Sequence, residues 1–313
     1  MIGTFQKAGQ EEAEMAIQSA AKAFETWKYT SAEERANFLF KAAEEVKNRR
    51  LEINAWMIME AGKNFAEADA DTCEAIDFLE FYGREALRYA EMQPLTPWDG
   101  EKNEYFYIPL GVGVCVPPWN FPFAIMAGIT TTAILSEKKN LIKKTTKKPK
   151  MGRIFVCIFY KIGLPKGVLN FFVASGAEAG DYLVDHPKTR FISFTGSMEV
   201  GLRIIERAAK TNPGQIWIKR VIAEMGGKDA ILVDSDTDVD TAVAGVVASA
   251  FGFQGQKCSA CSRAIIHQDI YDEFVAKLKV EVDKLEMGDP ADNYRVGPVV
   301  SKKAMESILN YIE

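Results

Sequence analysis

The stretch that decides the fold is Gly111-Val112-Gly113-Val114-Cys115-Val116-Pro117-Pro118-Trp119-Asn120. An apolar run bounded by glycine and proline is typical of a buried strand that ends in a rigid turn. Similar strand-like runs recur toward the C-terminus, and helical stretches separate them. These runs occupy residues 167–172, 190–194, 221–224 and 229–233. Alternation of this kind predicts a parallel sheet covered by helices, that is, an α/β fold.

Upstream of this stretch, the first ninety residues predict a lead-in of amphipathic helices. Ser31 is a suitable N-cap, and Glu34 completes a capping box three residues later. The apolar stripe that follows has helical spacing and consists of Ala36, Leu39, Ala42, Ala43 and Val46. Residues 94–109 are polar and turn-rich and end in the strand-like segment 105–108. We therefore predict an extended arm or hairpin there.

Length and composition narrow the classes of protein. The chain has 313 residues, of which 48% are hydrophobic and 26% charged, and its formal net charge is −5. This length predicts about two domains. No apolar run approaches the ~18 residues of a membrane span, the charge does not favour nucleic acid, and the N-terminus lacks a signal-peptide layout. We expect a cytoplasmic protein that binds a small molecule rather than a membrane or a nucleic acid.

The cysteines are expected to be free thiols. There are five of them, an odd number, and they are spread too widely for a disulfide framework. His186 and His267 are the only histidines, so a histidine base beside a nucleophile is disfavoured and no metal site is expected. Cys258 and Cys261 form a Cys-x-x-Cys motif, for which a redox pair or half of a zinc site is the alternative interpretation.

The most informative stretch for chemistry is 254–261, together with 223–228 upstream. A nucleophilic cysteine needs a positive or dipolar neighbourhood, which backbone amides and Lys257 are able to supply. A cysteine and an acid without a histidine suggest that Cys258 attacks a carbonyl, hydride leaves to a nicotinamide, and Glu224 activates water. The alternative for Glu224 is an ion-paired structural carboxylate, although the adjacent Gly226 favours close approach of the backbone to a ligand.

Two further motifs follow predicted strands. The prolines around Trp119 and Asn120 fix a turn at the carboxyl end of a strand, which holds the Asn120 amide where it can donate to an oxyanion. A turn-capping asparagine is the alternative. The motif Phe194-Thr195-Gly196-Ser197 leads into a predicted helix over 198–210, whose N-terminal amides and dipole suit a phosphate.

Together these motifs resemble the aldehyde dehydrogenase superfamily in order and approximate spacing. They are Pro118-Trp119-Asn120, Phe194-Thr195-Gly196-Ser197, Glu224-Met225-Gly226-Gly227-Lys228 and Gly255-Gln256-Lys257-Cys258. More narrowly, residues 163–171, 210–217 and 258–263 resemble the bacterial 1-pyrroline-5-carboxylate dehydrogenases, which oxidise L-glutamate γ-semialdehyde to glutamate in proline and arginine breakdown. The alternatives are a dehydrogenase for another aldehyde, such as succinate semialdehyde, and a non-catalytic relative.

The resemblance implies a role for each residue of the site. Cys258 would be the nucleophile, Glu224 the general base for deacylation, and Asn120 an oxyanion donor together with the backbone amide of Cys258. Ser259 would contact the substrate's α-carboxylate, with Lys257 beside it. The cofactor would be NAD, with NADP as the alternative, and its implied contacts are Trp119, Lys143, Phe194, Gly196, Ser197 and Gly226.

The resemblance also implies an architecture. Residues 1–93 and 110–225 would form a Rossmann-like NAD(P)-binding domain, and 94–109 part of an oligomerisation arm. Residues 226–313 would be the first part of an α/β catalytic domain. Because the family continues for roughly a further domain's length, we expect this domain to be incomplete and the chain to be less active than full-length relatives. Those relatives are expected to be homo-oligomers.

One segment departs from the family pattern. Seven lysines crowd residues 138–150, where the family has a buried strand and the start of a helix. Lys143 alone matches, at the position that reaches the adenosine ribose in relatives. As a charge run, the segment predicts a solvated loop or a weak anion-binding patch, which puts cofactor binding at the adenosine end in question.

Overall fold

The chain folds into two compact units. The computed structural model describes residues 3–135, 139–144 and 149–313. Unit 1 comprises Met1–Ile53 and Asp71–Glu224, and unit 2 comprises Asn54–Ala70 and Met225–Glu313.

Residues 54–70 group with the C-terminal part of the chain, whereas the family resemblance implied that they belong to the cofactor-binding domain. The side-chain amide of Asn64 donates to the backbone carbonyl of Arg295 at 3.3 Å, and the side-chain oxygen of Asn293 accepts from the backbone N–H of Phe65 at 3.1 Å. These contacts join the segment to the C-terminal part of the chain. The other division, after Glu224, lies one residue before the predicted one.

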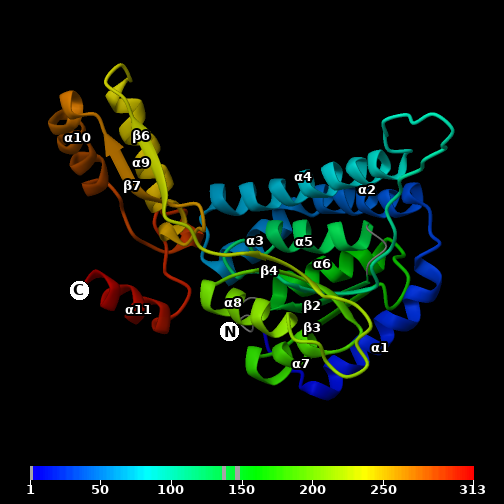
Figure 1. Ribbon diagram of the computed structural model, residues 1–313. Helices are drawn as coiled ribbons and strands as arrows, with labels where there is room; N and C mark the ends of the chain where they lie inside the picture. The colour runs from blue at the N-terminus through cyan, green and yellow to red at the C-terminus, as the bar shows by residue number, and fades with distance from the viewer. Residues whose placement is uncertain (1–2, 136–138, 145–148) are drawn as a thin grey trace. The chain divides into compact units, whose positions relative to one another are not determined.

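Unit 1 is built on a parallel sheet of five strands in the order β3-β2-β1-β4-β5 (Figure 1). The strands are β1 (Val112–Val116), β2 (Lys139–Lys144), β3 (Leu169–Val173), β4 (Thr189–Thr195) and β5 (Arg220–Glu224). Cys115 of β1 lies opposite Ile142 of β2 and Ser193 of β4. The strand order reverses between β1 and β4, which is where open α/β sheets bind ligands. The predicted parallel α/β sheet is confirmed.

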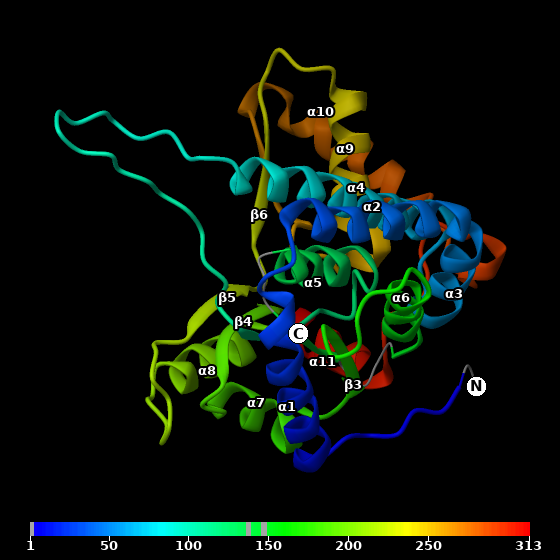
Figure 2. The same cartoon turned by 90° about the vertical axis from the view of Figure 1, so that its right-hand side faces the viewer.

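Helices cover both faces of this sheet. Figures 1 and 2 show α5 and α6 on one face, with α2 lying over them, and α1, α7 and α8 on the other. The bounds are α1 (Gln10–Trp27), α2 (Ala32–Asn48), α5 (Ala124–Leu135), α6 (Pro149–Lys161), a short π-helix (Gly176–Gly180), α7 (Asp181–Asp185) and α8 (Met198–Ala208). Two further helices, α3 (Arg50–Ala61) and α4 (Phe65–Ala90), each contribute residues to both units.

Aromatic rings fill the core of unit 1 between the sheet and the helices α5 and α6. Phe123 and Phe155 are buried and meet edge to face, with ring centroids 5.9 Å apart. Phe191 of β4 is also buried, and a Cβ placed on Gly113 of β1 would lie 1.8 Å from its ring. Glycine is therefore required at position 113 because the ring occupies the space of a side chain.

The helical lead-in forms as predicted. Ser31 is the N-cap of α2, and its side chain accepts a hydrogen bond from the backbone N–H of Glu34 at 3.2 Å. The apolar stripe of α2 that was predicted from its spacing is buried. Local capping and a 3.6-residue period are thus sufficient to define this helix.

The arm differs from its prediction in one respect. Residues 92–111, all of them described, contain a turn at Asp99-Gly100 but neither helix nor strand. The strand expected over 105–108 is therefore absent there. Its aromatic and β-branched residues suit a strand, but the structure gives them no partner strand to pair with.

Strand β2 corrects the prediction for the lysine-rich segment. Residues Lys139–Lys144 pair with β1 on one side and β3 on the other, whereas the charge run predicted a solvated loop. Pairing with two neighbouring strands outweighs composition here, because strand preference depends mainly on context. Lys138, Lys147 and Lys148 of the predicted block lie outside the described residues.

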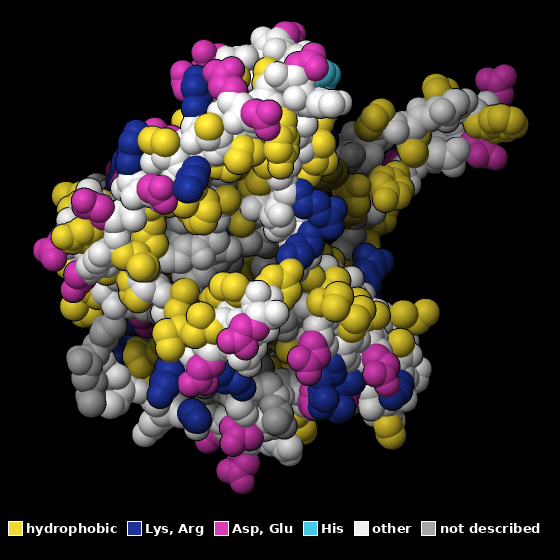
Figure 3. All heavy atoms as spheres, turned by 90° about the vertical axis from the view of Figure 1, so that its left-hand side faces the viewer, with side chains coloured by type: hydrophobic (Ala, Val, Ile, Leu, Met, Phe, Trp, Pro, Cys, Tyr) yellow, Lys and Arg dark blue, Asp and Glu magenta, His cyan; other side chains and the backbone are white. Residues whose placement is uncertain are grey.

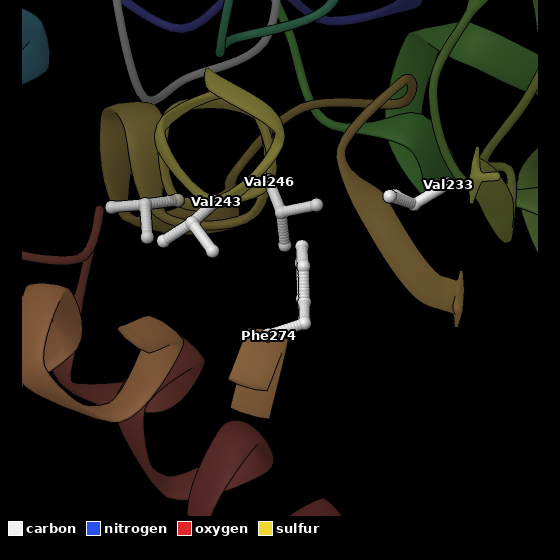
Figure 4. Close-up of a cluster of buried hydrophobic side chains, with 5 residues drawn as sticks. Val233, Val243, Val246 and Phe274 are labelled. Atoms are coloured by element: carbon white, nitrogen blue, oxygen red, sulfur yellow. The ribbon is translucent and has the colours of Figure 1, made fainter. Parts of the chain in front are cut away.

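Unit 2 has a parallel sheet of two strands, β6 (Asp229–Val233) and β7 (Cys261–Ile266). Its helices are α9 (Val239–Phe251), α10 (Tyr271–Asp283) and α11 (Lys302–Ile312), with short 3₁₀ turns at Gly252–Gly255, Gln268–Ile270 and Pro290–Asp292. Val233, Val243, Val246 and Phe274 converge in its core with Val247 (Figure 4).

Part of the small sheet is exposed. Leu232 of β6 and Ile265 of β7 are opposite each other in register and are 76% and 52% exposed. Figure 3 shows hydrophobic side chains, drawn in yellow, between charged ones on one face of the molecule. Within the described ranges, no helix has the length and apolarity needed to cross a bilayer.

Candidate active site

The carboxyl edge of the unit 1 sheet gathers several of the predicted site residues. Asn120 follows β1, Gly196 and Ser197 follow β4, and Glu224 ends β5. In a parallel sheet the carboxyl ends of the strands lie at one edge. Thr195 is paired with Glu224, and the N–H of Gly196 donates to the Glu224 carbonyl oxygen at 3.0 Å. The backbone therefore links the predicted phosphate motif directly to the predicted base.

Glu224 is presented to solvent by its strand. The side chains of β5 alternate between exposed and half-buried positions, and Glu224 is at an exposed one. A carboxylate in this position is accessible to water.

The loop that carries Asn120 is held at two points. The Asn120 side-chain oxygen accepts from the backbone N–H of Phe121 at 3.1 Å, so the Nδ2 end of the amide is the donating end. The helix that follows begins at Ala124, whose N–H donates to the carboxylate of Asp71 at 2.6 Å, and Asp71 is fully buried. An amide held this way is suited to donate to an oxyanion.

The N-terminus of α8 has the features of a phosphate site. Ser197 is its N-cap, and among the described residues the Ser197 side chain makes no capping hydrogen bond. The N–H of Gly201 donates to the Ser197 carbonyl at 2.9 Å, so the first-turn amides before it lack helical acceptors. A Cβ on Gly196 would lie 2.6 Å from the ring of Phe194. Backbone amides and a glycine placed like this fit a dinucleotide's phosphates.

The remaining predicted cofactor residues follow strands nearer the other end of the sheet. Trp119 is half-buried in the loop after β1. Lys143 lies near the carboxyl end of β2, opposite Phe172 of β3. Since β2, β1 and β4 are neighbours in that order, Lys143, Trp119 and Gly196 lie along one edge. Gly226, in contrast, belongs to unit 2.

The predicted nucleophile, Cys258, lies in unit 2, in a turn between α9 and β7. It is half-buried and its thiol is free. The N–H of Ala260 donates to the Lys257 carbonyl at 3.4 Å, which closes the turn. A Cβ on Gly227 would lie 2.9 Å from the Cys258 carbonyl oxygen, whereas one on Gly226 would have no described atom within 4 Å. Because Gly227 has no side chain, the backbone at Gly227 lies directly against the backbone of Cys258.

Backbone strain precedes this turn. Phe253 and Gln254 have φ of 48° and 56°, in the left-handed region, and Gly255 has φ of 66°. Left-handed non-glycine residues cost about 1–3 kcal/mol each and persist only where surrounding contacts hold them. Phe253 is buried with the Lys63 ammonium 4.7 Å from its ring centre. The Gln256 side-chain oxygen accepts from the backbone N–H of Val300 at 2.9 Å.

Glu67 is a residue of this region that sequence reasoning missed. Its carboxylate lies 2.8 Å from the Lys257 ammonium, and the two side chains are only 21% and 20% exposed. Lys257 therefore directs its charge to Glu67, while Ser259, on the other side of Cys258, is exposed. Glu67 precedes Lys257 by 190 residues, so no local motif connects them.

The described residues bring together no group of three or more His, Cys, Asp or Glu side chains able to hold a metal ion.

Comparisons with known proteins agree with these features. The model of the aldehyde dehydrogenase family matches residues 1–313. The 1-pyrroline-5-carboxylate dehydrogenase of Geobacillus kaustophilus is 54% identical over 314 residues, which cover 100% of this chain and 61% of that protein. The Bacillus pumilus enzyme of the same name is 52% identical over 315 residues, with the same coverage.

Solved structures give the same result for the fold. A Thermus 1-pyrroline-5-carboxylate dehydrogenase described with bound NAD superimposes with a TM-score of 0.95 at 46% identity, over 98% of this chain and 60% of that one. A proline utilization A protein from Bdellovibrio bacteriovorus also gives a TM-score of 0.95, at 41% identity over 98% of this chain and 32% of that one. The chain spans about 61% of the length of the curated relatives it matches.

Proposed function

The chain belongs to the aldehyde dehydrogenase family, and we propose that it oxidises L-glutamate γ-semialdehyde to L-glutamate with NAD. The observation that supports this choice of substrate is the ion pair of Lys257 and Glu67, whose charged atoms lie 2.8 Å apart. Lys257 directly precedes Cys258, and Glu67 lies in the first turn of α4. The two charges pair with each other in this structure, and in the proposed complex Lys257 would also meet the α-carboxylate and Glu67 the α-ammonium of an amino-acid semialdehyde. Succinate semialdehyde has no ammonium group. The names of the most similar relatives support the same substrate.

NAD is proposed as the cofactor, with NADP as the alternative. The first-turn amides of α8 and the backbone at Gly196 suit its pyrophosphate. Trp119 is half-buried at the same edge, the buried Phe194 ring lies against Gly196 and supports that backbone, and Lys143 is assigned to the adenosine end by family resemblance. When bound, the nicotinamide accepts the hydride that leaves the substrate carbon.

The chemistry of the chain's own residues follows in two stages. The Cys258 thiolate adds to the aldehyde carbon, and the Asn120 amide and the Cys258 backbone N–H donate to the oxygen that becomes negative; loss of one such donor typically lowers the rate by about 10²–10³. After loss of hydride the substrate is a thioester on Cys258. Glu224 takes a proton from water, the resulting hydroxide attacks the thioester, and the carboxylate leaves as the thiol reforms.

The assignment of the nucleophile and the base is tested by mass spectrometry of the intact chain after mixing with L-glutamate γ-semialdehyde and NAD. We expect an acyl adduct on Cys258 that accumulates in Glu224→Gln, because water is no longer activated, and is absent in Cys258→Ala. Cys157→Ala, at an exposed thiol in unit 1, is the matched control and keeps the adduct. An adduct on Cys261 in place of Cys258, or equal accumulation with and without Glu224, would contradict these roles.

The substrate is tested separately through Glu67. With Glu67→Gln, we expect adduct formation from L-glutamate γ-semialdehyde to slow by roughly tenfold, which corresponds to about 1.4 kcal/mol, and formation from succinate semialdehyde to change little. Glu273→Gln, in an exposed ion pair with Lys277, is the control. If Glu67→Gln slowed adduct formation equally with both aldehydes, the ion pair of Lys257 and Glu67 would only position the turn around Cys258. The proposal of an amino-acid semialdehyde as substrate would then be wrong.

We also propose that the arm, residues 94–109, joins copies of the chain. Its Trp98, Phe106 and Ile108 side chains are 69%, 71% and 68% exposed, and exposed apolar groups of this size favour association. Light scattering with Phe106→Asp tests this: the variant is expected to shift toward monomer, whereas a wild-type chain that is already monomeric would contradict the proposal.

A further inference from the structure

Aldehyde oxidation uses only one of the two cysteines of unit 2. Cys258 and Cys261 are both free and both half-buried. The other three cysteines of the chain belong to unit 1 and are Cys73, Cys115 and Cys157. Cys261 is thus the one other thiol in the unit and in the loop of the nucleophile, and the chemistry above gives it no role.

The backbone shortens the separation between the two cysteines. Three residues of extended chain span about 10 Å, which is too far for a disulfide, whose Cα atoms lie about 4.4–6.8 Å apart. Here the Lys257 carbonyl and the Ala260 N–H, 3.4 Å apart, close a turn around Cys258. The turn folds the chain back just before Cys261, which makes the separation of the two residues shorter than in an extended chain.

Strand β7 has a bulge next to Cys261, the second cysteine of the Cys-x-x-Cys motif. Asp229 pairs with Cys261 but Ala230 pairs with Arg263, so Ser262 is an extra residue in β7. Such bulges re-aim side chains at the end of a strand. The N–H of Cys261 donates to the Ser249 hydroxyl at 3.2 Å, and its thiol donates to the Arg263 carbonyl at 3.3 Å. The Cys261 thiol is therefore held near the backbone of β7 only by its hydrogen bond to the Arg263 carbonyl. A thiol is a weak donor, so little free energy is lost when this bond breaks.

We propose that Cys258 and Cys261 form an oxidative modification site that hydrogen peroxide converts to a disulfide. The Cys258 thiolate attacks one peroxide oxygen, the O–O bond breaks, and hydroxide leaves, which gives a sulfenic acid on Cys258. The Cys261 sulfur then attacks the Cys258 sulfur, its proton and the hydroxyl group leave as water, and the S–S bond forms. Two electrons pass from the two thiols to one peroxide.

The disulfide protects the nucleophile and is readily reversed. A sulfenic acid without a neighbouring thiol continues to the sulfinic and sulfonic acids, which thiols do not reduce. The ring that Cys258 and Cys261 would close contains only two intervening residues, Ser259 and Ala260, and strained or exposed disulfides are the more easily reduced ones. The disulfide thus keeps Cys258 in an oxidised form that a dithiol reduces back to the free thiol.

The test uses the full chain and hydrogen peroxide, without aldehyde or cofactor, so that its outcome is independent of the proposed dehydrogenase activity. Trypsin cleaves after Lys257 and Arg263, which releases a peptide with these two cysteines and no other. After peroxide treatment and alkylation, we expect this peptide to lack two hydrogens and to carry no alkyl group. Dithiothreitol before alkylation should restore two alkylation sites.

Cys261→Ala separates protection from simple reactivity. In this variant, recovery of the Cys258 thiol by dithiothreitol is expected to fall by roughly fivefold or more, with sulfinic acid in its place. Cys157→Ala is the control and should recover as the wild type does. The proposal is overturned if wild-type Cys258 becomes sulfinic acid as fast as in Cys261→Ala, or if the disulfide joins Cys258 to Cys157 of another molecule.

Discussion

Unit 1 and unit 2 hold their functional residues in different ways. In unit 1 most of the residues lie at the ends of parallel strands of one five-stranded sheet, and the centre of β4 is buried, with Phe191 and Ile192 2% and 0% exposed. In unit 2 the nucleophile's turn adjoins a sheet of two strands, and its fixed points are single contacts such as Lys257 with Glu67. The geometry of the cofactor edge is thus a property of a whole sheet, whereas that of Cys258 depends on a few local interactions.

The largest expected effect is the separate loss of unit 2. Phe274 is 1% exposed in a core cluster of that unit (Figure 4), so Phe274→Ala should lower the unit's free energy of unfolding by about 3–5 kcal/mol. Hydrogen exchange followed by mass spectrometry should show loss of protection in unit 2 peptides and little change in β1 and β4. Equal loss in both units would mean that they unfold as one and would break the comparison.

A second substitution should affect unit 1 in the same selective way. The Cβ added by Gly113→Ala would lie 1.8 Å from the buried Phe191 ring, and overpacking of this kind costs about 1–3 kcal/mol or more. Urea unfolding followed by tryptophan fluorescence measures the change. Adding Phe191→Leu, which removes the obstructing ring, should recover part of the loss. A double variant no more stable than Gly113→Ala would show that the ring is not the obstacle.

A smaller effect tests the strain beside Cys258. At position 254, whose φ is 56°, glycine should be more stable than alanine by about 1 kcal/mol, because it adopts the left-handed region without strain. Exposed Gly245 in helix α9 should show the opposite order, with Gly245→Ala gaining about 1 kcal/mol. Denaturant unfolding of Gln254→Gly, Gln254→Ala and Gly245→Ala measures both. The same order at both sites would mean that position 254 is not strained.

A pH dependence is expected in unit 1 as well. Burial lowers the pKa of Lys219 from 10.5 to about 8, and its ammonium donates to the Val184 carbonyl at 2.6 Å. Between these values the unfolded chain holds the proton and the folded chain has released it, so the free energy of unfolding should rise with pH across that window. Lys219→Met should flatten the rise, whereas exposed Lys166→Met should not. Identical slopes in both variants would contradict this.

The sequence predicted elements that are determined by nearby residues. β1 and β6 are short apolar runs between turn-forming residues, and the structure places both at the predicted bounds. The cap at Ser31 depends on a residue three positions away, which a sequence displays directly. In contrast, β2 is made a strand by pairing with β1 and β3, and its lysine-rich composition conceals this.

For the candidate site too, the sequence identified the residues that stand in local motifs and missed a contact between distant residues. Cys258, Glu224 and Asn120 stand in recognisable motifs, from which their proposed roles follow. Glu67 could not be predicted, because its partner Lys257 is 190 residues away and an acidic residue in the first turn of a helix has an ordinary explanation in the helix dipole.

The buried carboxylate of Asp71 also has a consequence for the order of folding. Asp71 and Ala124 are 53 residues apart, and contacts of such separation form late because a long loop must close first. During synthesis, α4 leaves the ribosome before α5. The Asp71 carboxylate is therefore made before the Ala124 N–H that donates to it. We therefore expect the loop that presents Asn120 to gain this anchor late in folding, and pulse labelling of the Ala124 amide hydrogen during refolding measures when it does so.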